Sequence, residues 1–237
     1  MNAAERTHRR GFFSRVFGAA VAASLPMAAV RAPAAQESEP DDWLKEVKGS
    51  HRCLFDFPQH KNGLPLLHVL NYLNTYVAAY KTGTNEVGAV GTFYGVGGQA
   101  SIPLAFNDAM WGKYGLGTYT ALKDAAGKPY TRNVFYRPTK NDLHLLMQAL
   151  QTPNIPALAD AMPGLGIENL QKMGTKFLLC ANALGAWCLE LEARNKGKAP
   201  EIEKELRANV LPGVTIVPAM VIAIEKAQAA GIRYNRQ

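Results

Sequence analysis

The alternation of apolar and polar residues along the chain predicts strands that alternate with helices. Short apolar runs bounded by turn-forming or polar residues predict strands at residues 51–57, 86–94, 175–180, 213–217 and 232–234. Apolar residues three or four positions apart predict helices at residues 64–80, 101–114, 141–150, 155–162, 167–173, 181–195, 201–210 and 218–231. This order favours an α/β fold, a three-layer α/β/α domain with a mostly parallel sheet.

One long segment between the second and third predicted strands lacks this regularity. Residues 115–139 are rich in Gly, Lys, Tyr and Thr, and they follow no clear period. We expect them to leave the sheet as a lid or a hairpin and to begin an insertion around residues 115–173, which makes this connection about fifty residues longer than an ordinary one. The domain itself is predicted to span residues 51–237, after an acidic, proline-containing linker at residues 36–50.

The first residues have the three parts of an export signal in order. Basic residues that include Arg9 and Arg10 precede an apolar run at residues 16–30, and small residues at 32–34 suit a cleavage site. The paired arginines, followed by Gly-Phe-Phe, resemble a twin-arginine (Tat) signal. We therefore expect the Tat machinery to export the folded precursor to the periplasm and residues 1–35 to be removed. The apolar run is too short and too rich in alanine for a stable membrane span.

Removing the signal changes the charge of the chain. The whole sequence carries 26 basic and 19 acidic residues, a net charge of +7. Five of the basic residues and one acidic residue lie in residues 1–35, so the rest of the chain carries only +3. No stripe of Lys and Arg interleaved with aromatic residues is present, and we expect no nucleic-acid partner.

The cysteine count is odd for a protein in an oxidising compartment. The chain has Cys53, Cys180 and Cys188. A helical rise of about 12 Å separates residues eight positions apart, which excludes a disulfide between Cys180 and Cys188. Any disulfide within the chain must therefore use Cys53. No cluster of Cys and His residues is spaced for zinc, and we predict no metal site.

Cys180 occupies the most informative position in the sequence. The apolar run at residues 175–180 ends at this cysteine, and Asn182, a capping-type residue, opens a helix two positions later. A thiol is thereby predicted at the carboxyl edge of the sheet, where ligands gather in α/β proteins. The positive end of the helix dipole there favours thiolate over thiol. The alternative is a buried structural cysteine, because free cysteines are among the most buried residues.

Three other residues are predicted near the same edge. Tyr94 and Gly95 follow the second strand and are candidates for a ligand pocket with Asn182. His60 lies in the loop after the first strand, where it can influence the protonation of Cys180. The alternative for His60 is a solvent-exposed loop histidine without a role.

The glycine-rich turn at residues 95–98 has two possible explanations. Backbone amides of such a loop can bind an anion at a strand-to-helix turn, but glycine is the default residue for turns, which favours a simple tight turn. The segment fits neither the P-loop nor the dinucleotide-binding pattern, so we predict no cofactor. Glu190 and Glu192, farther along, are expected on a solvated helix face.

Taken in this order, several segments resemble the DsrE/DsrF-like family. They are Phe93-Tyr94-Gly95, Cys180-x-Asn182-Ala183, and Gly213 to Pro218 followed by a helix that ends in Gln228-x-x-Gly231-x-x-Tyr234. The resemblance covers most of residues 51–237 in element order. It implies a compact three-layer α/β/α domain that often forms oligomers, and a cysteine equivalent to Cys180 that carries a persulfide in sulfur-relay members. The long insertion and the export signal depart from those members.

Two hypotheses about function follow from the residues and the resemblance together. The first is an exported DsrE-like binding or oligomerisation module of unknown ligand, in which Cys180 is merely buried. The second is a thiol-based sulfur carrier or sulfurtransferase that uses Cys180 and exchanges sulfur with a relay partner protein. Under both hypotheses we expect a homo-oligomer.

Overall fold

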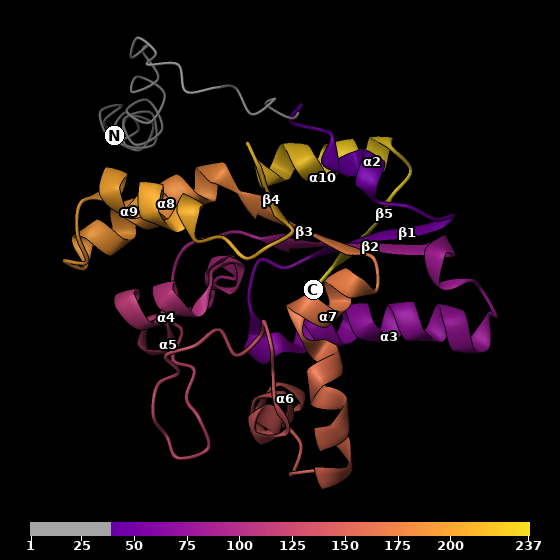
Figure 1. Cartoon of the computed structure of the whole chain (residues 1–237), viewed down its shortest axis with the longest axis horizontal. Helices are drawn as coiled ribbons and strands as arrows, with labels where there is room; N and C mark the ends of the chain where they lie inside the picture. The colour runs from indigo at the N-terminus through magenta and orange to yellow at the C-terminus, as the bar shows by residue number, and fades with distance from the viewer. Residues whose placement is uncertain (1–38) are drawn as a thin grey trace, which may run out of the picture. The chain divides into compact units, whose positions relative to one another are not determined.

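The computed structural model describes residues 39–237, and the predicted signal and the first residues of the linker lie outside the described residues. Its centre is a five-stranded parallel sheet with the strand order β4-β3-β2-β1-β5. The strands are β1 His51–Asp56, β2 Val87–Phe93, β3 Thr175–Cys180, β4 Val214–Val217 and β5 Arg233–Arg236. Helices cover both faces, which confirms the predicted three-layer α/β/α fold (Figure 1).

Nine helices and five short 3-10 segments connect and cover the described strands. The helices begin with α2 Trp43–Glu46, α3 Leu64–Ala79, α4 Asp108–Tyr114, α5 Leu116–Tyr119 and α6 Leu143–Leu150. They continue with α7 Ile167–Lys172, α8 Ala181–Ala193, α9 Ala199–Ala208 and α10 Met220–Ala229. The 3-10 segments are Lys61–Gly63, Thr84–Glu86, Ile102–Ala105, Lys140–Asp142 and Pro156–Leu165.

Strand residues divide between two hydrophobic cores on opposite faces of the sheet. Phe55, Phe93 and Phe177 belong to the core that α3 covers, and the rings of Phe93 and Phe177 stack with their centroids 5.1 Å apart. The alternate residues, such as Leu54 and Leu178, belong to the core beneath α2 and α10. Figure 1 shows α2 and α10 on one side of the sheet and α3 and α7 on the other. This alternation follows from the two-residue period of side chains along a strand.

Some predicted elements have different bounds in the structure. The helix expected at residues 101–114 is interrupted, because the side chain of Asn107 accepts the N–H of Met110 at 3.3 Å and starts α4 afresh. The helix expected from Pro218 starts at Met220 instead. The segment expected as a helix at residues 155–162 is a 3-10 segment that begins at Pro156.

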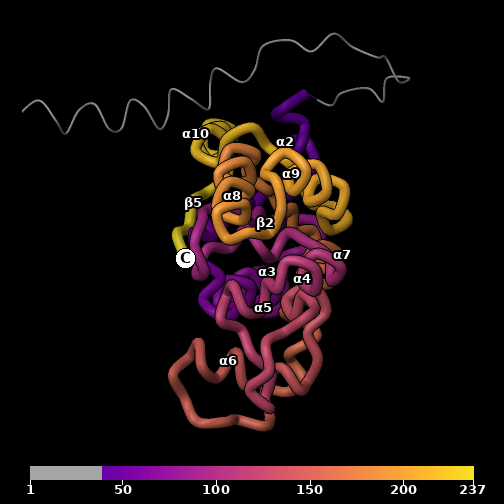
Figure 2. Tube along the Cα trace, turned by 90° about the vertical axis from the view of Figure 1, so that its left-hand side faces the viewer, coloured from indigo at the N-terminus to yellow at the C-terminus, as the bar shows by residue number. Residues whose placement is uncertain are grey.

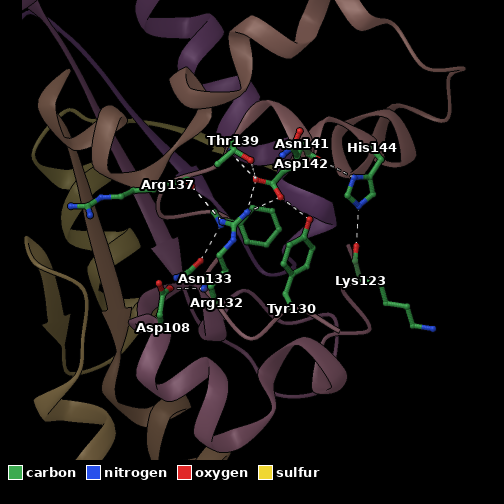
Figure 3. Close-up of polar contacts among 11 residues, drawn as sticks. Asp108, Lys123, Tyr130, Arg132, Asn133, Arg137, Thr139, Asn141, Asp142 and His144 are labelled. Atoms are coloured by element: carbon green, nitrogen blue, oxygen red, sulfur yellow. Dashed lines mark hydrogen bonds and ion pairs between the residues drawn. The ribbon is translucent and has the colours of Figure 1, made fainter. Parts of the chain in front are cut away.

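The insertion between β2 and β3 lies outside the sheet, as expected for residues 115–139. Figures 1 and 2 both place α6 farther from the sheet than α3. The insertion is anchored by Asp142, whose side chain is 3% exposed. Its carboxylate accepts hydrogen bonds from the Tyr130 hydroxyl (2.7 Å), from Arg132 (2.7 and 2.8 Å) and from the N–H and hydroxyl of Thr139 (2.7 and 2.9 Å) (Figure 3). The last part of the excursion, residues 130–139, is thereby tied to the start of α6.

Candidate functional site

The thiol of Cys180 lies where two helices begin. Cys180 is the last residue of β3 and the N-cap residue of α8. Its Sγ accepts the backbone N–H of Ala183 at 3.4 Å and the backbone N–H of Met220 at 3.3 Å. Ala183 is in the first turn of α8, and Met220 is the first residue of α10. Two helix N-termini therefore direct N–H groups at one sulfur atom.

The topology of the sheet explains why these helices meet at Cys180. The chain leaves β3 for α8, which packs into the core shared with α3, and it leaves the neighbouring β4 for α10, which packs into the other core. Adjacent strands whose connections leave toward opposite faces form the switch point at which α/β proteins bind ligands. A hydrogen bond of 3.2 Å from the Asn182 N–H to the Pro218 carbonyl joins the two connections, and Cys180 is only 5% exposed.

The surroundings of the three thiols differ, and all three are free and buried. Burial raises the pKa of Cys53 to about 11. Burial, assisted by Glu203, raises the pKa of Cys188 to about 12. Only at Cys180 does the sulfur accept hydrogen bonds from backbone N–H groups among these three residues. Such donors stabilise a thiolate relative to a thiol.

Tyr94 and Asn182 lie beside Cys180, but Asn182 contributes differently from what the sequence predicts. Thr92 is the register partner of Leu178, so Tyr94, two residues on, comes opposite Cys180, and both pack in the core beneath α10. Cys180 itself caps α8, and Asn182 is the second residue of that helix. Asn182 therefore acts through its backbone N–H, which donates to the Pro218 carbonyl, rather than as the capping residue.

His60 is buried rather than solvent-exposed, and its ring bonds to Gly98 and Asn62 rather than to Cys180. Its residue exposure is 1%. Nδ1 accepts the N–H of Asn62 at 3.2 Å, which leaves Nε2–H to donate to the Gly98 carbonyl at 3.1 Å. Burial lowers the pKa of His60, and the bond to Gly98 opposes that effect. His60 thus holds the glycine-rich turn in place as a neutral imidazole.

The backbone conformation of the turn after β2 requires a glycine at position 95. Its φ of +89° is in the left-handed region, which a side chain makes unfavourable. A Cβ at this position would also come within 3.3 Å of the Cβ of Ala100. Backbone geometry therefore explains why a glycine occupies this position. Its role in a ligand pocket stays a prediction.

A buried carboxylate on β1 was missed by the sequence interpretation. Asp56 is 4% exposed and accepts the hydroxyl of Tyr234 at 2.7 Å and that of Thr92 at 3.2 Å. Burial and the neighbouring Asp56 together raise the pKa of Tyr94. By strand parity, Asp56, Tyr94 and Cys180 face the same side of the sheet at its carboxyl edge. An aspartate within the apolar run at residues 51–57 was the available signal.

A cavity of about 700 Å³ lies between α3 and β5. Aromatic residues on one side of α3, including Tyr72, Tyr76 and Tyr80, line it together with Arg236 and Gln237. The rings of Tyr72 and Tyr76 meet edge to face with centroids 5.0 Å apart. None of the site residues predicted from the sequence lines this cavity.

Comparison with known proteins gives no match. No protein-family model, no curated protein and no solved structure matches the chain. The DsrE/DsrF-like resemblance and the twin-arginine signal therefore stay predictions. Within residues 39–237, no three His, Cys, Asp or Glu side chains come together as a metal-binding group. In the same part of the chain, no helix is both long and apolar enough to span a membrane.

Proposed function

We propose that the chain is an exported DsrE-like sulfur carrier whose reactive group is the thiol of Cys180. The observation that supports this most directly is the pair of N–H groups, from Ala183 and Met220, at 3.4 and 3.3 Å from Sγ. Fixed N–H dipoles at helix N-termini stabilise negative charge on sulfur, whether thiolate or persulfide. Cys53 and Cys188 are unsuitable carriers because burial raises the pKa of both thiols.

The proposed transfer is a thiol–persulfide exchange. The Cys180 thiolate attacks the outer sulfur of a donor persulfide, R–S–S–H. A bond from Sγ to that sulfur forms while the donor's S–S bond breaks, and the donor leaves as a thiolate that takes up a proton. Attack by an acceptor thiolate on the Cys180 persulfide reverses the process. Since Cys180 is 5% exposed, the connections held by Asn182 and Pro218 must separate for a partner's sulfur to enter.

Persulfide loading of the purified chain tests this proposal. Incubation with polysulfide, followed by peptide mass mapping, is expected to add the mass of one sulfur atom at Cys180. Cys180→Ser should abolish loading, whereas Cys188→Ser should leave it unchanged. Loading that persists in Cys180→Ser, or a wild-type Cys180 that stays unmodified while its thiol is free, contradicts the proposal.

Export is a separate part of the proposal and has its own test. The motif supports routing of a folded precursor through the Tat machinery to the periplasm. Replacing Arg9 and Arg10 together by Lys should retain the precursor inside the cell, as measured by fractionation. Normal export of this double variant contradicts the Tat assignment and leaves the sulfur-carrier proposal untouched.

A binding or oligomerisation module is the second candidate function. The cavity between α3 and β5 supports ligand binding, because its volume and its aromatic lining are typical of small-molecule sites. Val221 and Ile222 on α10 are 75% and 51% exposed, which supports contact with another copy of the chain. Light scattering on wild type and Val221→Asp tests the oligomer. A monomeric wild type contradicts it.

A further inference from the structure

The glycine-rich turn after β2 binds a carboxylate of the chain itself. Glu190 extends from α8, and its Oε2 accepts the Gly97 N–H at 3.1 Å and the Tyr119 hydroxyl at 2.8 Å. Its Oε1 accepts two hydrogen bonds from Arg194, at 2.7 and 3.0 Å. Burial acts to raise the pKa of Glu190, but Arg194, Tyr119 and the Gly97 N–H outweigh it and lower that pKa. Glu190 is therefore an ionised carboxylate in a set of donors, not a residue of a solvated face.

One donor beside this carboxylate is unused. The indole N–H of Trp187, a fully buried residue three positions before Glu190, has no hydrogen-bond partner. The Trp187 ring lies 5.8 Å from the ring of Tyr119, centroid to centroid. Residues three apart on a helix lie on the same face, so Trp187 and Glu190 both extend from α8 toward Tyr119, whose hydroxyl binds the Glu190 carboxylate. A buried N–H without a partner is unfavourable and rare in folded proteins.

We infer that Gly97, Tyr119, Trp187 and Arg194 form a binding site for a small oxyanion, in which Glu190 is a displaceable internal ligand. The two oxygens of the Glu190 carboxylate already accept hydrogen bonds from Gly97, Tyr119 and Arg194. An anion with three or four oxygens, such as sulfate or phosphate, has a further acceptor for the Trp187 N–H.

The surroundings allow the exchange of ligands. The side chain of Glu190 is 24% exposed, so a change of rotamer can carry its carboxylate into solvent. No heavy atom lies within 4 Å of the position that a Cβ on Gly97 would occupy, which leaves room beside the turn. Glu190 lies ten positions after Cys180 along α8, a helical rise of about 15 Å. The oxyanion is therefore not the group that reacts with Cys180, and the site goes beyond the proposed function.

Titration with sulfate, followed by ¹H–¹⁵N NMR, tests the inference. In the wild type, sulfate should shift the Trp187 indole resonance and the Gly97 amide resonance in a saturable way. Glu190→Ala removes the internal ligand and should bind sulfate about tenfold more tightly. Glu203→Ala is the matched control, because Glu203 and Arg207 on α9 repeat the same four-residue ion pair, at 2.7 and 2.9 Å, away from the glycine-rich turn. This control should bind sulfate like the wild type.

Two additional measurements separate an oxyanion site from a structural carboxylate contact. Trp187→Phe keeps an aromatic ring but removes the indole N–H. Added to the Glu190→Ala variant, it should weaken sulfate binding about tenfold relative to Glu190→Ala alone. Acetate should bind Glu190→Ala more weakly than sulfate does. The inference is overturned if sulfate shifts neither resonance in the wild type, or if acetate binds Glu190→Ala as tightly as sulfate.

Discussion

Asp142 and Cys180 are two buried groups that can carry negative charge, and their partners differ. The Asp142 carboxylate accepts five hydrogen bonds, two of them from the guanidinium of Arg132. The Cys180 sulfur accepts two hydrogen bonds, both from backbone N–H groups, at 3.3 and 3.4 Å. Asp142 lies in the insertion, whereas Cys180 lies at the carboxyl edge of the sheet between the starts of α8 and α10.

The difference indicates which buried group holds the fold together and which is available for chemistry. A carboxylate with a complete set of charged and neutral donors is stable where it is and has little capacity for another partner. Backbone N–H groups stabilise charge on sulfur without neutralising it by a counter-ion, so the sulfur keeps its nucleophilic lone pairs. The following predictions test this contrast.

Replacing Asp142 should give the largest effect, and it should affect stability. Asp142→Asn removes the charge that pairs with Arg132 and weakens the hydrogen bonds from Tyr130 and Thr139. Because the Arg132 side chain is 35% exposed and stays hydrated, the cost is about 2–4 kcal/mol. Urea unfolding measures the loss. Asp160→Asn, which removes the exposed partner of Lys140 in the same insertion, is the control and should change stability by less than about 1 kcal/mol. Equal small effects of both substitutions would show that Asp142 does not anchor the insertion.

Thiol labelling at neutral pH should be about two orders of magnitude slower at Cys53 than at an ordinary thiol. A pKa of about 11 rather than 9 leaves Cys53 with about 100-fold less thiolate, and Cys188, with a pKa of about 12, has less still. Since Cys180 is the cysteine whose sulfur accepts backbone N–H groups, a small reagent such as methyl methanethiosulfonate should modify Cys180 first at neutral pH. Peptide mass mapping over time ranks the three rates. A Cys180 that reacts only after denaturation, like Cys53, would support the binding-module hypothesis instead.

The sequence predicts the position of Cys180 better than it predicts the partners of Cys180. The apolar run that ends at Cys180 marks a strand buried on both faces, and a strand of that kind must end at a sheet edge. Met220, forty residues later, supplies the second N–H, and no local pattern indicates that contact. The contacts of His60 could not be predicted from the sequence either, because its buried hydrogen bonds with Asn62 and Gly98 depend on how two loops pack. Long-range packing also brings Glu190, on α8, to the glycine-rich turn.

Acid should weaken the protein partly through Asp142. Burial acts to raise the pKa of Asp142, but the N–H of Thr139, the hydroxyl of Tyr130 and the guanidinium of Arg132 outweigh it and hold that pKa below 3.8. A carboxyl group with a lowered pKa in the folded state stabilises the fold above its unfolded pKa, and this contribution is lost as the pH falls through the folded value. Unfolding free energies of wild type and Asp142→Asn, measured from neutral pH to below pH 3.8, should therefore converge. A constant difference across that range would contradict the lowered pKa.

Serine substitutions at Cys180 and Cys188 should give the smallest changes in stability, and they compare the two thiols directly. A serine hydroxyl at position 180 can accept the same two N–H groups, and serine is a favourable N-cap residue, so Cys180→Ser should change stability by less than about 0.5 kcal/mol. Cys188 is 1% exposed inside the apolar core around α8, where a serine hydroxyl is poorly accommodated, and Cys188→Ser should cost about 1–3 kcal/mol. Thermal and urea unfolding of the two variants measure the difference. Cys180→Ser should nevertheless lose all persulfide loading, since oxygen cannot carry the sulfur, while Cys188→Ser keeps it. If Cys180→Ser proves as destabilising as Cys188→Ser, the sulfur of Cys180 is a packing group, and its two N–H donors no longer set it apart from the other thiols.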